Sequence, residues 1–430
     1  MPSSLGDLLD LQSTALTFTA NFTGAAANIS GCALDAQMLV SRMQVRVASQ
    51  SLLNQNESGF MGKMRQAYFG NDRQDSVLIG DFQSSDEYTS VTVGTAGAPG
   101  YACRYSNQAI YARASDDAYN IIGFTQTYTL PLSYLQAFFN NATLLPLGLL
   151  QMVEIDLYLA PSAAICVTAI PNSIATFATA DAGNVPIGAG ILTQGQLVIG
   201  SMQLRYDVVT GSELLQQSLQ LLASSDSPLQ IPCYVNESAS VSLPAAGNQT
   251  VQVSRSCYSL EKMYLGRTFS NHDGADTMVK GIFYNGALQN YQIQSSDGKF
   301  YPLTPYRDFY EAIGAGSYNG IGGYYSNERR ANITRKQLLD IESIGFAPAP
   351  GNPLSMSTKA VIVTDFGKLR AEDTREVSFN GLSTATTGSV LNIRYTDATV
   401  GGNFITNQCR IQLEFLRVIH VQNRTVSIPV

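Results

Sequence analysis

Apolar and polar side chains alternate along most of this chain, which is the pattern of strands with one buried face. A clear example lies near the midpoint, where apolar side chains occupy every second position: Met202, Leu204, Tyr206 and Val208. Similar runs are rich in Val, Ile, Thr and Tyr, are separated by clusters of Gly, Asn, Asp and Pro, and predict strands. They span residues 15–22, 42–47, 121–130, 151–159, 197–209, 250–256, 288–294, 360–365, 390–395 and 410–428.

Helical spacing is rare, and its best example directly follows the midpoint strand. Leucines recur there at helical intervals, at Leu214, Leu215, Leu219 and Leu222. Thr210 and Glu213 have the spacing of a capping box in front of them. The chain returns to strand-like sequence at residues 229–235, and further helices are predicted at residues 58–68 and 334–344. Few helices and long glycine-rich connections favour β-sandwiches over alternating βαβ units.

Two pairs of similar stretches indicate that the second half of the chain repeats the first. Residues 43–55 align with residues 251–263 at an offset of 208 and share Gln, Val, Ser and Leu. Residues 201–209 align with residues 410–418 at an offset of 209 and share Gln, Leu and Val. Two matches at nearly the same offset predict two copies of a β unit of about 200 residues. The midpoint helix would then join the last strand of one copy to the first strand of the next.

The composition supports a folded chain with an unusually uncharged surface. Of the 430 residues, 45% are apolar and 14% are charged, whereas about a quarter are charged in an average protein. We expect two domains and a connector, at residues 1–210, 211–228 and 229–430. A sparsely charged exterior suits a protein that covers its surface with copies of itself, and it also suits a secreted β-sandwich.

Charge and hydropathy exclude several kinds of partner. The net charge is −7 and no basic run is longer than Arg329-Arg330, which argues against direct binding of nucleic acid. The first residues lack the basic and apolar regions of a signal peptide. The longest apolar stretch, residues 144–153, is too short to cross a bilayer. We therefore expect a soluble protein without a transmembrane segment, made in a reducing compartment.

The sequence carries no recognisable catalytic, cofactor-binding or metal-binding motif, so we predict no residues in these roles and no enzyme. Its two histidines, His272 and His420, lie far apart, and no nucleophile motif accompanies them. No His or Cys cluster has metal-ligand spacing. A β-rich hydrolase would need paired acids, which occur as Asp116 with Asp117 and Glu372 with Asp373.

The cysteines and the glycosylation motifs have ordinary explanations. The cysteines are scattered without a CxxC pair, at Cys32, Cys103, Cys166, Cys233, Cys257 and Cys409, and such residues are typical free core thiols. A disulfide between Cys233 and Cys257 stays open. Asn-x-Ser/Thr motifs begin at Asn21, Asn28, Asn56, Asn141, Asn236, Asn248, Asn332 and Asn423. Because a chain rich in Asn, Ser and Thr produces them by chance, we favour chance over glycosylation.

The 22 tyrosines allow two interpretations. Several cluster at residues 301–314 and 322–327. They can pack at strand edges and loop bases, or they can form contacts between subunits, where the ring is buried and the hydroxyl stays hydrogen-bonded.

Several stretches, in order, resemble the double jelly-roll major capsid proteins of DNA viruses. AQMLVSRMQVRVASQSLLNQNESGFMGKMRQAYFG is similar to an early strand followed by a short helix, and YNIIGFTQTYTLPLSYLQAFFNNATLLPLGLLQMVEIDLYLA to strands around a Leu/Pro turn. SFNGLST, VLNIRYTDA and RIQLEFLRVIHVQNRTVSI resemble the closing strands of the second jelly roll. The chain length and the segment FYPLTPYRDFYEAI are most similar to virophage or polinton-like virus capsid proteins.

This resemblance implies an all-β fold of two consecutive eight-stranded jelly-roll sandwiches with a linker helix and long loops. It also implies homotrimeric, pseudo-hexameric capsomers that tile an icosahedral virion beside penton and minor capsid proteins. Obligate interfaces of that kind bury on the order of 2,000 Å² or more. The main alternative is a secreted or cell-surface β-sandwich that binds glycans or a receptor through tyrosine-rich loops.

Overall fold

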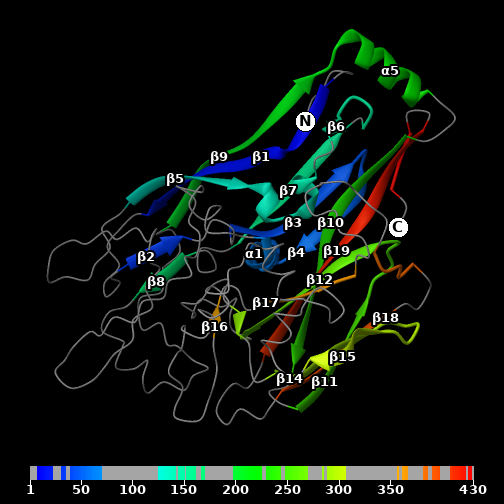
Figure 1. The fold of residues 1–430 in the computed structure, drawn as a ribbon. Helices are drawn as coiled ribbons and strands as arrows, with labels where there is room; N and C mark the ends of the chain where they lie inside the picture. Colours follow the sequence, from blue (N-terminus) through cyan, green and yellow to red (C-terminus); the bar gives the residue numbers. More distant parts are fainter. Residues whose placement is uncertain are drawn as a thin grey trace.

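The computed structural model consists mainly of antiparallel strands (Figure 1). It describes residues 7–22, 31–34, 39–69, 124–141, 144–150, 152–160, 166–169, 197–224, 229–243, 247–269, 283–284, 288–306, 356–357, 361–366, 381–385, 390–397, 407–422 and 425–428. Elements of the first half are β1 Asp7–Phe22, β2 Gly31–Leu34, β3 Val40–Val47, β4 Gln50–Asn56, α1 Ser58–Phe69, β5 Phe124–Pro131, the 3₁₀ turns η2 Leu132–Tyr134 and η3 Ala137–Asn140, β6 Leu144–Pro146, β7 Val153–Leu159, β8 Cys166–Ala169 and β9 Leu197–Thr210. Those that follow are α5 Glu213–Ala223, β10 Leu229–Leu243, β11 Gly247–Ser254, β12 Leu260–Phe269, β13 Phe283–Tyr284, β14 Leu288–Gln294, β15 Phe300–Tyr306, β16 Met356–Ser357, β17 Val361–Asp365, β18 Val390–Asp397, β19 Asn407–Gln422 and β20 Thr425–Ser427.

The strands of the second half pair in a nested order, the first with the last. β10 pairs antiparallel with β19, β11 with β18, β12 with β17, and β14 with β15. Two four-strand paths result, β10-β19-β12-β17 and β11-β18-β14-β15. The Tyr291 hydroxyl on one sheet lies 3.2 Å from the Thr364 hydroxyl on the other. A long hairpin rolled into two packed sheets in this way is a jelly roll.

The first half repeats the nested order in its outer strands. β1 pairs with β9, β2 with β8 and β3 with β7, all antiparallel. β5 and β6 extend the β1 sheet, while β4 pairs with β3 in the other. The rings of Phe18 and Tyr128 stack in its core with centroids 5.4 Å apart. Among the described strands, every sheet uses strands of one half alone; the domain limits given above stay a prediction.

The two repeated stretches have different structural outcomes. β9 and β19 are equivalent, because each closes its own half by pairing with the first strand. Residues 43–55 form the β3–β4 hairpin of one sheet, whereas residues 251–263 pass from β11 in one sheet to β12 in the other. The hairpin turns on Ala48 and Ser49, which have φ of 47° and 67°. Positive φ at both central residues matches strand twist and keeps the two strands in one sheet.

The predicted helices at residues 58–68 and at the midpoint are confirmed as α1 and α5. The predicted capping box was wrong: Ser212 caps α5, with its hydroxyl accepting from the Leu215 N–H at 3.4 Å. Thr210 cannot serve because it is the last residue of β9. The run at residues 410–428 divides into β19 and β20, which pair as a hairpin. The helix predicted at residues 334–344 lies outside the described residues.

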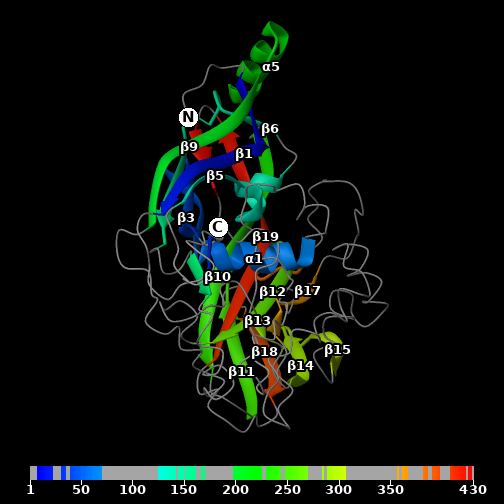
Figure 2. The same ribbon diagram turned by 90° about the vertical axis from the view of Figure 1, so that its left-hand side faces the viewer.

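α1 lies between the two halves (Figure 2). Its backbone approaches β3 in the first half and β12, β17 and β19 in the second. Phe60, Met61 and Met64 on α1 are buried. Gly62 allows close approach of the 3₁₀ turn, because a Cβ there would lie 2.8 Å from the Tyr134 carbonyl oxygen. The helix therefore supplies apolar side chains to the junction of the halves.

A glycine pair tests a close backbone approach inside the second half, between Gly381 and Leu260. A Cβ at Gly381 would lie 2.7 Å from the carbonyl carbon of Leu260 and overlap its oxygen, whereas a Cβ at Gly200 would meet nothing within 4 Å. We expect Gly381→Ala to lower the free energy of unfolding by about 2–3 kcal/mol, because backbone cannot move aside as a side chain can. Gly200→Ala should leave it nearly unchanged. Urea titration of both variants measures the difference, and equal midpoints would contradict the described approach.

Candidate functional site: the contact between the two halves

The described residues gather no obvious reactive centre. No group of three or more His, Cys, Asp or Glu in the described part of the chain could hold a metal ion. No helix within the described ranges is long and apolar enough to cross a bilayer. His420 lies on β19, while His272 and both acidic pairs at residues 116–117 and 372–373 lie outside the described residues.

The polar groups that stand out lie at the free edge of β10. β10 pairs with β19 along one side, so every second residue directs its N–H and C=O to the other side. Such an edge needs partners or it attracts other strands. The partners here are side chains of the first half.

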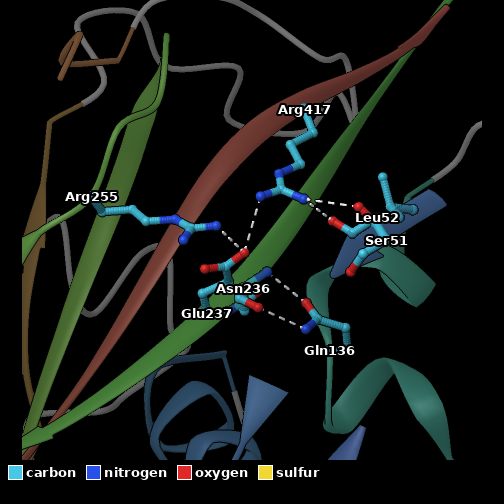
Figure 3. A network of polar contacts seen from close by, with 7 residues as sticks. All are labelled: Ser51, Leu52, Gln136, Asn236, Glu237, Arg255 and Arg417. Atoms are coloured by element: carbon cyan, nitrogen blue, oxygen red, sulfur yellow. Dashed lines mark hydrogen bonds and ion pairs between the residues drawn. The ribbon is translucent and has the colours of Figure 1, made fainter. Parts of the chain in front are cut away.

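Gln136 satisfies one position of this edge. Its Nε2 donates to the Asn236 carbonyl at 2.9 Å, and its Oε1 accepts from the Asn236 N–H at 2.7 Å. Nε2 also donates to Oε1 of Gln55 at 2.7 Å, and Oδ1 of Asn236 accepts from the Ala137 N–H at 3.0 Å. Gln136 and Asn236 are fully buried. Figure 3 shows the paired amide contacts.

Asn141 satisfies the next outward position, two residues earlier on β10. Its Oδ1 accepts from the Tyr234 N–H at 3.1 Å, and its Nδ2 donates to the Tyr234 carbonyl at 3.3 Å. The two side-chain amides thus reproduce the exchange of N–H and C=O that a neighbouring strand would provide. We call Gln136, Asn141, Tyr234 and Asn236 the amide clasp.

The local sequence explains why both amides reach the edge. Pro131 ends β5, and 3₁₀ turns follow on each side of Gln136, which is itself extended. Asn141 is also extended, directly after η3. The surrounding apolar side chains are buried and fix the segment: Leu132, Leu135, Phe138 and Phe139. The two amides stand at either end of a short turn whose first three residues are buried.

A charged cluster joins the halves beside the clasp (Figure 3). Arg255 and Arg417 both bind Oε1 of Glu237. Arg417 also donates to the backbone carbonyl of Leu52 on β4. Burial raises the pKa of Glu237, and the two guanidinium groups oppose that rise. Because the Glu237 carboxylate binds the Arg417 guanidinium, it holds this group beside the Leu52 carbonyl of the first half.

β19 is buried on both faces, and the face toward α1 is polar. Arg410, Gln412 and Glu414 alternate with Ile411, Leu413 and Phe415, and all six are buried. The Arg410 guanidinium binds the Glu57 carboxylate and lies 4.0 Å above the Phe60 ring. Glu414 accepts from Lys262 at 3.3 Å and from the Tyr264 hydroxyl at 2.9 Å. Because Arg410 belongs to the second half and Glu57 to the first, their ion pair makes the contact between the halves partly ionic.

Gln50 makes a further contact at the end of the chain. Its Nε2 donates to the Val426 carbonyl at 2.9 Å, and its Oε1 accepts from the Ile428 N–H at 3.0 Å. The Gln50 side-chain amide thus bonds one backbone C=O and one backbone N–H, as the clasp amides do, and holds β20 to β4. Ser238 adds a bond from its hydroxyl to the Asn56 carbonyl at 2.7 Å.

The structure decides part of the cysteine and glycosylation questions. Cys233, Cys257 and Cys409 are free and buried, and burial raises the pKa of the Cys233 thiol to about 12. A Cys233–Cys257 disulfide is therefore absent. Asn141 and Asn236, each the first residue of a glycosylation motif, are buried in the clasp, so neither can carry a glycan in this fold.

The described tyrosines of the cluster at residues 301–314 pack inside the second sandwich. Tyr306 is buried and stacks on Tyr291, with ring centroids 6.3 Å apart. Tyr301 meets Phe366 edge-on at 5.2 Å. The packing interpretation is confirmed for these two, and the other tyrosines of both clusters lie outside the described residues.

Apolar side chains are exposed where β9 enters α5. Leu214 and Leu221 are 74% and 72% exposed, and Val208 and Val209 are also exposed. Leu219 is buried on the inner side of the helix. The predicted apolar face therefore divides, with one part packed on the protein and the other left at the surface. Figure 1 shows α5 at one extreme of the molecule.

Two nested sandwiches in one chain define an all-β double jelly-roll protein. No protein-family model and no curated protein sequence matches the chain. Its fold is similar to VP54 of PBCV-1, in the form fitted into the virophage Sputnik, with a TM-score of 0.53 and 11% identity over 100% of this chain and 91% of that one. The Sputnik virophage structure matches with a TM-score of 0.53 and 13% identity, over 100% and 84% of the two chains.

The major capsid protein of Faustovirus matches with a TM-score of 0.51 and 10% identity, over 97% of this chain and 86% of that one. These neighbours are double jelly-roll major capsid proteins. The predicted fold class is confirmed: the chain has the double jelly-roll fold across its whole length.

An ion-pair cycle tests the contact at Arg410. We expect Glu57→Gln to lower the free energy of unfolding by about 2 kcal/mol, because the fully buried Arg410 loses its counter-charge. Adding Arg410→Met should recover part of the loss, because no charge then remains buried. Denaturant unfolding of the single and double variants measures the coupling.

An exposed pair provides the control for this cycle. Lys299 and Asp297 lie 2.6 Å apart with side chains 68% and 46% exposed. Hydrogen bonds from Lys299 and Ser295 lower the pKa of Asp297 to about 2. Asp297→Asn should nevertheless change stability little, because solvent screens the pair. Strictly additive losses at Glu57 and Arg410 would contradict the buried pairing.

Proposed function

We propose that this chain is a major capsid protein whose homotrimers form pseudo-hexameric capsomers that tile an icosahedral virion. The observation that carries the proposal is the pair of nested sandwiches in one polypeptide. Three such chains place six sandwiches around a ring, which approximates sixfold symmetry with threefold identity. The solved neighbours that share this fold are viral major capsid proteins.

The surface supports a protein that is covered by its neighbours. Charged residues are 14% of the chain, and leucines on α5 are left exposed. Homo-oligomeric interfaces are typically more apolar than other surfaces. Penton and minor capsid proteins would be the other partners, with the virion as the place of function and no direct contact to nucleic acid.

The role would be structural rather than enzymatic. The polar side chains described above join the two sandwiches to each other. Virophage or polinton-like origin remains a prediction from sequence. The secreted binding module fits less well, because two of its potential glycan sites are buried in the clasp and three thiols are free in the core.

Native mass spectrometry with electron microscopy tests the assembly. We expect a particle of three times the chain mass of 46.3 kDa, with a hexagonal outline and no attached sugar. The physical reason is that six similar sandwiches are needed to close the ring. A glycosylated monomer would contradict the capsid proposal and support the binding module.

A leucine pair separates assembly from folding. Leu214→Ser with Leu221→Ser changes only exposed side chains of α5, so the unfolding midpoint of the single chain should shift little. If copies of this chain cover α5, the double variant should form weaker trimers. Its trimer should then dissociate at a higher protein concentration than the trimer of the unaltered chain does. Sedimentation at a series of concentrations measures this. Gln220→Ser, an exposed change on the same helix, is the control.

A further inference from the structure

The amide clasp defines a register between the two sandwiches. Outward-facing groups on a strand recur every second residue, about 7 Å apart. Moving the clasp by one such step toward the start of β10 would place Asn141 opposite Pro232, which has no N–H to donate. Moving it the other way would place Gln136 opposite Ser238 and would break the bond from the Ser238 hydroxyl to the Asn56 carbonyl of the first half. Either shift therefore costs hydrogen bonds between the halves.

Directional contacts elsewhere add further fixed points. Gln50 holds Val426 and Ile428 near β20, and Arg417 on β19 donates to Leu52 on β4. Apolar burial is non-directional and allows sliding, whereas hydrogen bonds restrict both distance and angle. Contacts on three different strands restrict rotation as well as translation of one sandwich against the other.

We infer that Gln136 and Asn141 are positioning residues that set the angle and register between the two sandwiches. The consequence for assembly rests on the proposed function. A ring of three chains closes when the step within a chain and the step between chains add to one third of a turn, and its outline approaches a hexagon when each step is about one sixth of a turn. The clasp fixes the first of these steps before any second chain is present.

The angle can be measured in a single chain. Gln203 on β9 and Leu303 on β15 are exposed and lie on different sandwiches. Spin labels carried by unnatural residues at these positions report the distance between the halves by pulsed electron resonance, with labelled chains diluted in unlabelled ones. We expect one narrow distance distribution in the original protein. In Gln136→Met, which keeps length but removes the amide, the distribution should broaden at least twofold.

Hydrogen exchange provides a second readout that general destabilisation would not give. The N–H groups of Tyr234 and Asn236 donate to the clasp side chains Asn141 and Gln136. Gln136→Met should speed exchange at Asn236 at least tenfold while the β19-facing amides of β10 stay protected. Gln136→Asn retains an amide on a side chain one methylene shorter, so its exchange rate at Asn236 should lie between those of the unaltered protein and Gln136→Met. This variant replaces Gln136→Met in both experiments if Gln136→Met does not fold.

Ile293→Val is the matched control. Ile293 is fully buried in the second sandwich, on β14 and away from the clasp. The variant should lower the unfolding midpoint while leaving the distance distribution narrow. Equal broadening in the control, or an unchanged distribution in Gln136→Met with fast exchange at Asn236, would overturn the inference. Failure of the original protein to form trimers would instead overturn the proposed function, because the distance is measured within one chain.

Discussion

An open strand edge must find hydrogen-bond partners, and in this protein that requirement joins the two halves of the chain. β10 pairs with β19 along one side, and its other side forms no ladder with another strand among the described residues. The side-chain amides of Gln136 and Asn141 form hydrogen bonds with the backbone on this other side. Each amide carries one donor group and one acceptor group, as a peptide does. The first sandwich can therefore complete the edge of the second without merging the two sheets.

The contact between the halves is partly polar, although apolar side chains would serve stability equally well. Replacing a buried ion pair with apolar side chains is often neutral or stabilising, so Arg410 with Glu57 does not explain the fold's stability. What such groups add is orientation, since a misaligned guanidinium or amide is left buried and unsatisfied. The core inside each sandwich does not set the orientation of one sandwich against the other, so that orientation depends on the contact between them.

The sequence predicts the sandwiches well but not the contact between them. Period-two alternation identifies β14 and β9, although only Leu204 and Tyr206 of the predicted apolar face of β9 pack against the core. Local signals also locate α1 and α5, although the cap moves to Ser212. Gln136 and Asn141 escape such analysis because their partners lie about a hundred residues away on β10. The available signal was Gln136 and the adjacent pair Asn140-Asn141 inside a mostly apolar segment, where buried polar groups need partners.

Nested pairing also decides where the chain enters and leaves each sandwich. Asp7 lies opposite Thr210, and Leu229 lies opposite Val421, so the first and last strands of each half have their outer ends side by side. Figure 1 shows these ends gathered near α5. An eleven-residue helix is then sufficient to join the units, and neither sandwich has to open to admit the link. Two nested sandwiches in one chain thus leave their relative orientation as a further requirement, and we infer that the amide clasp meets it.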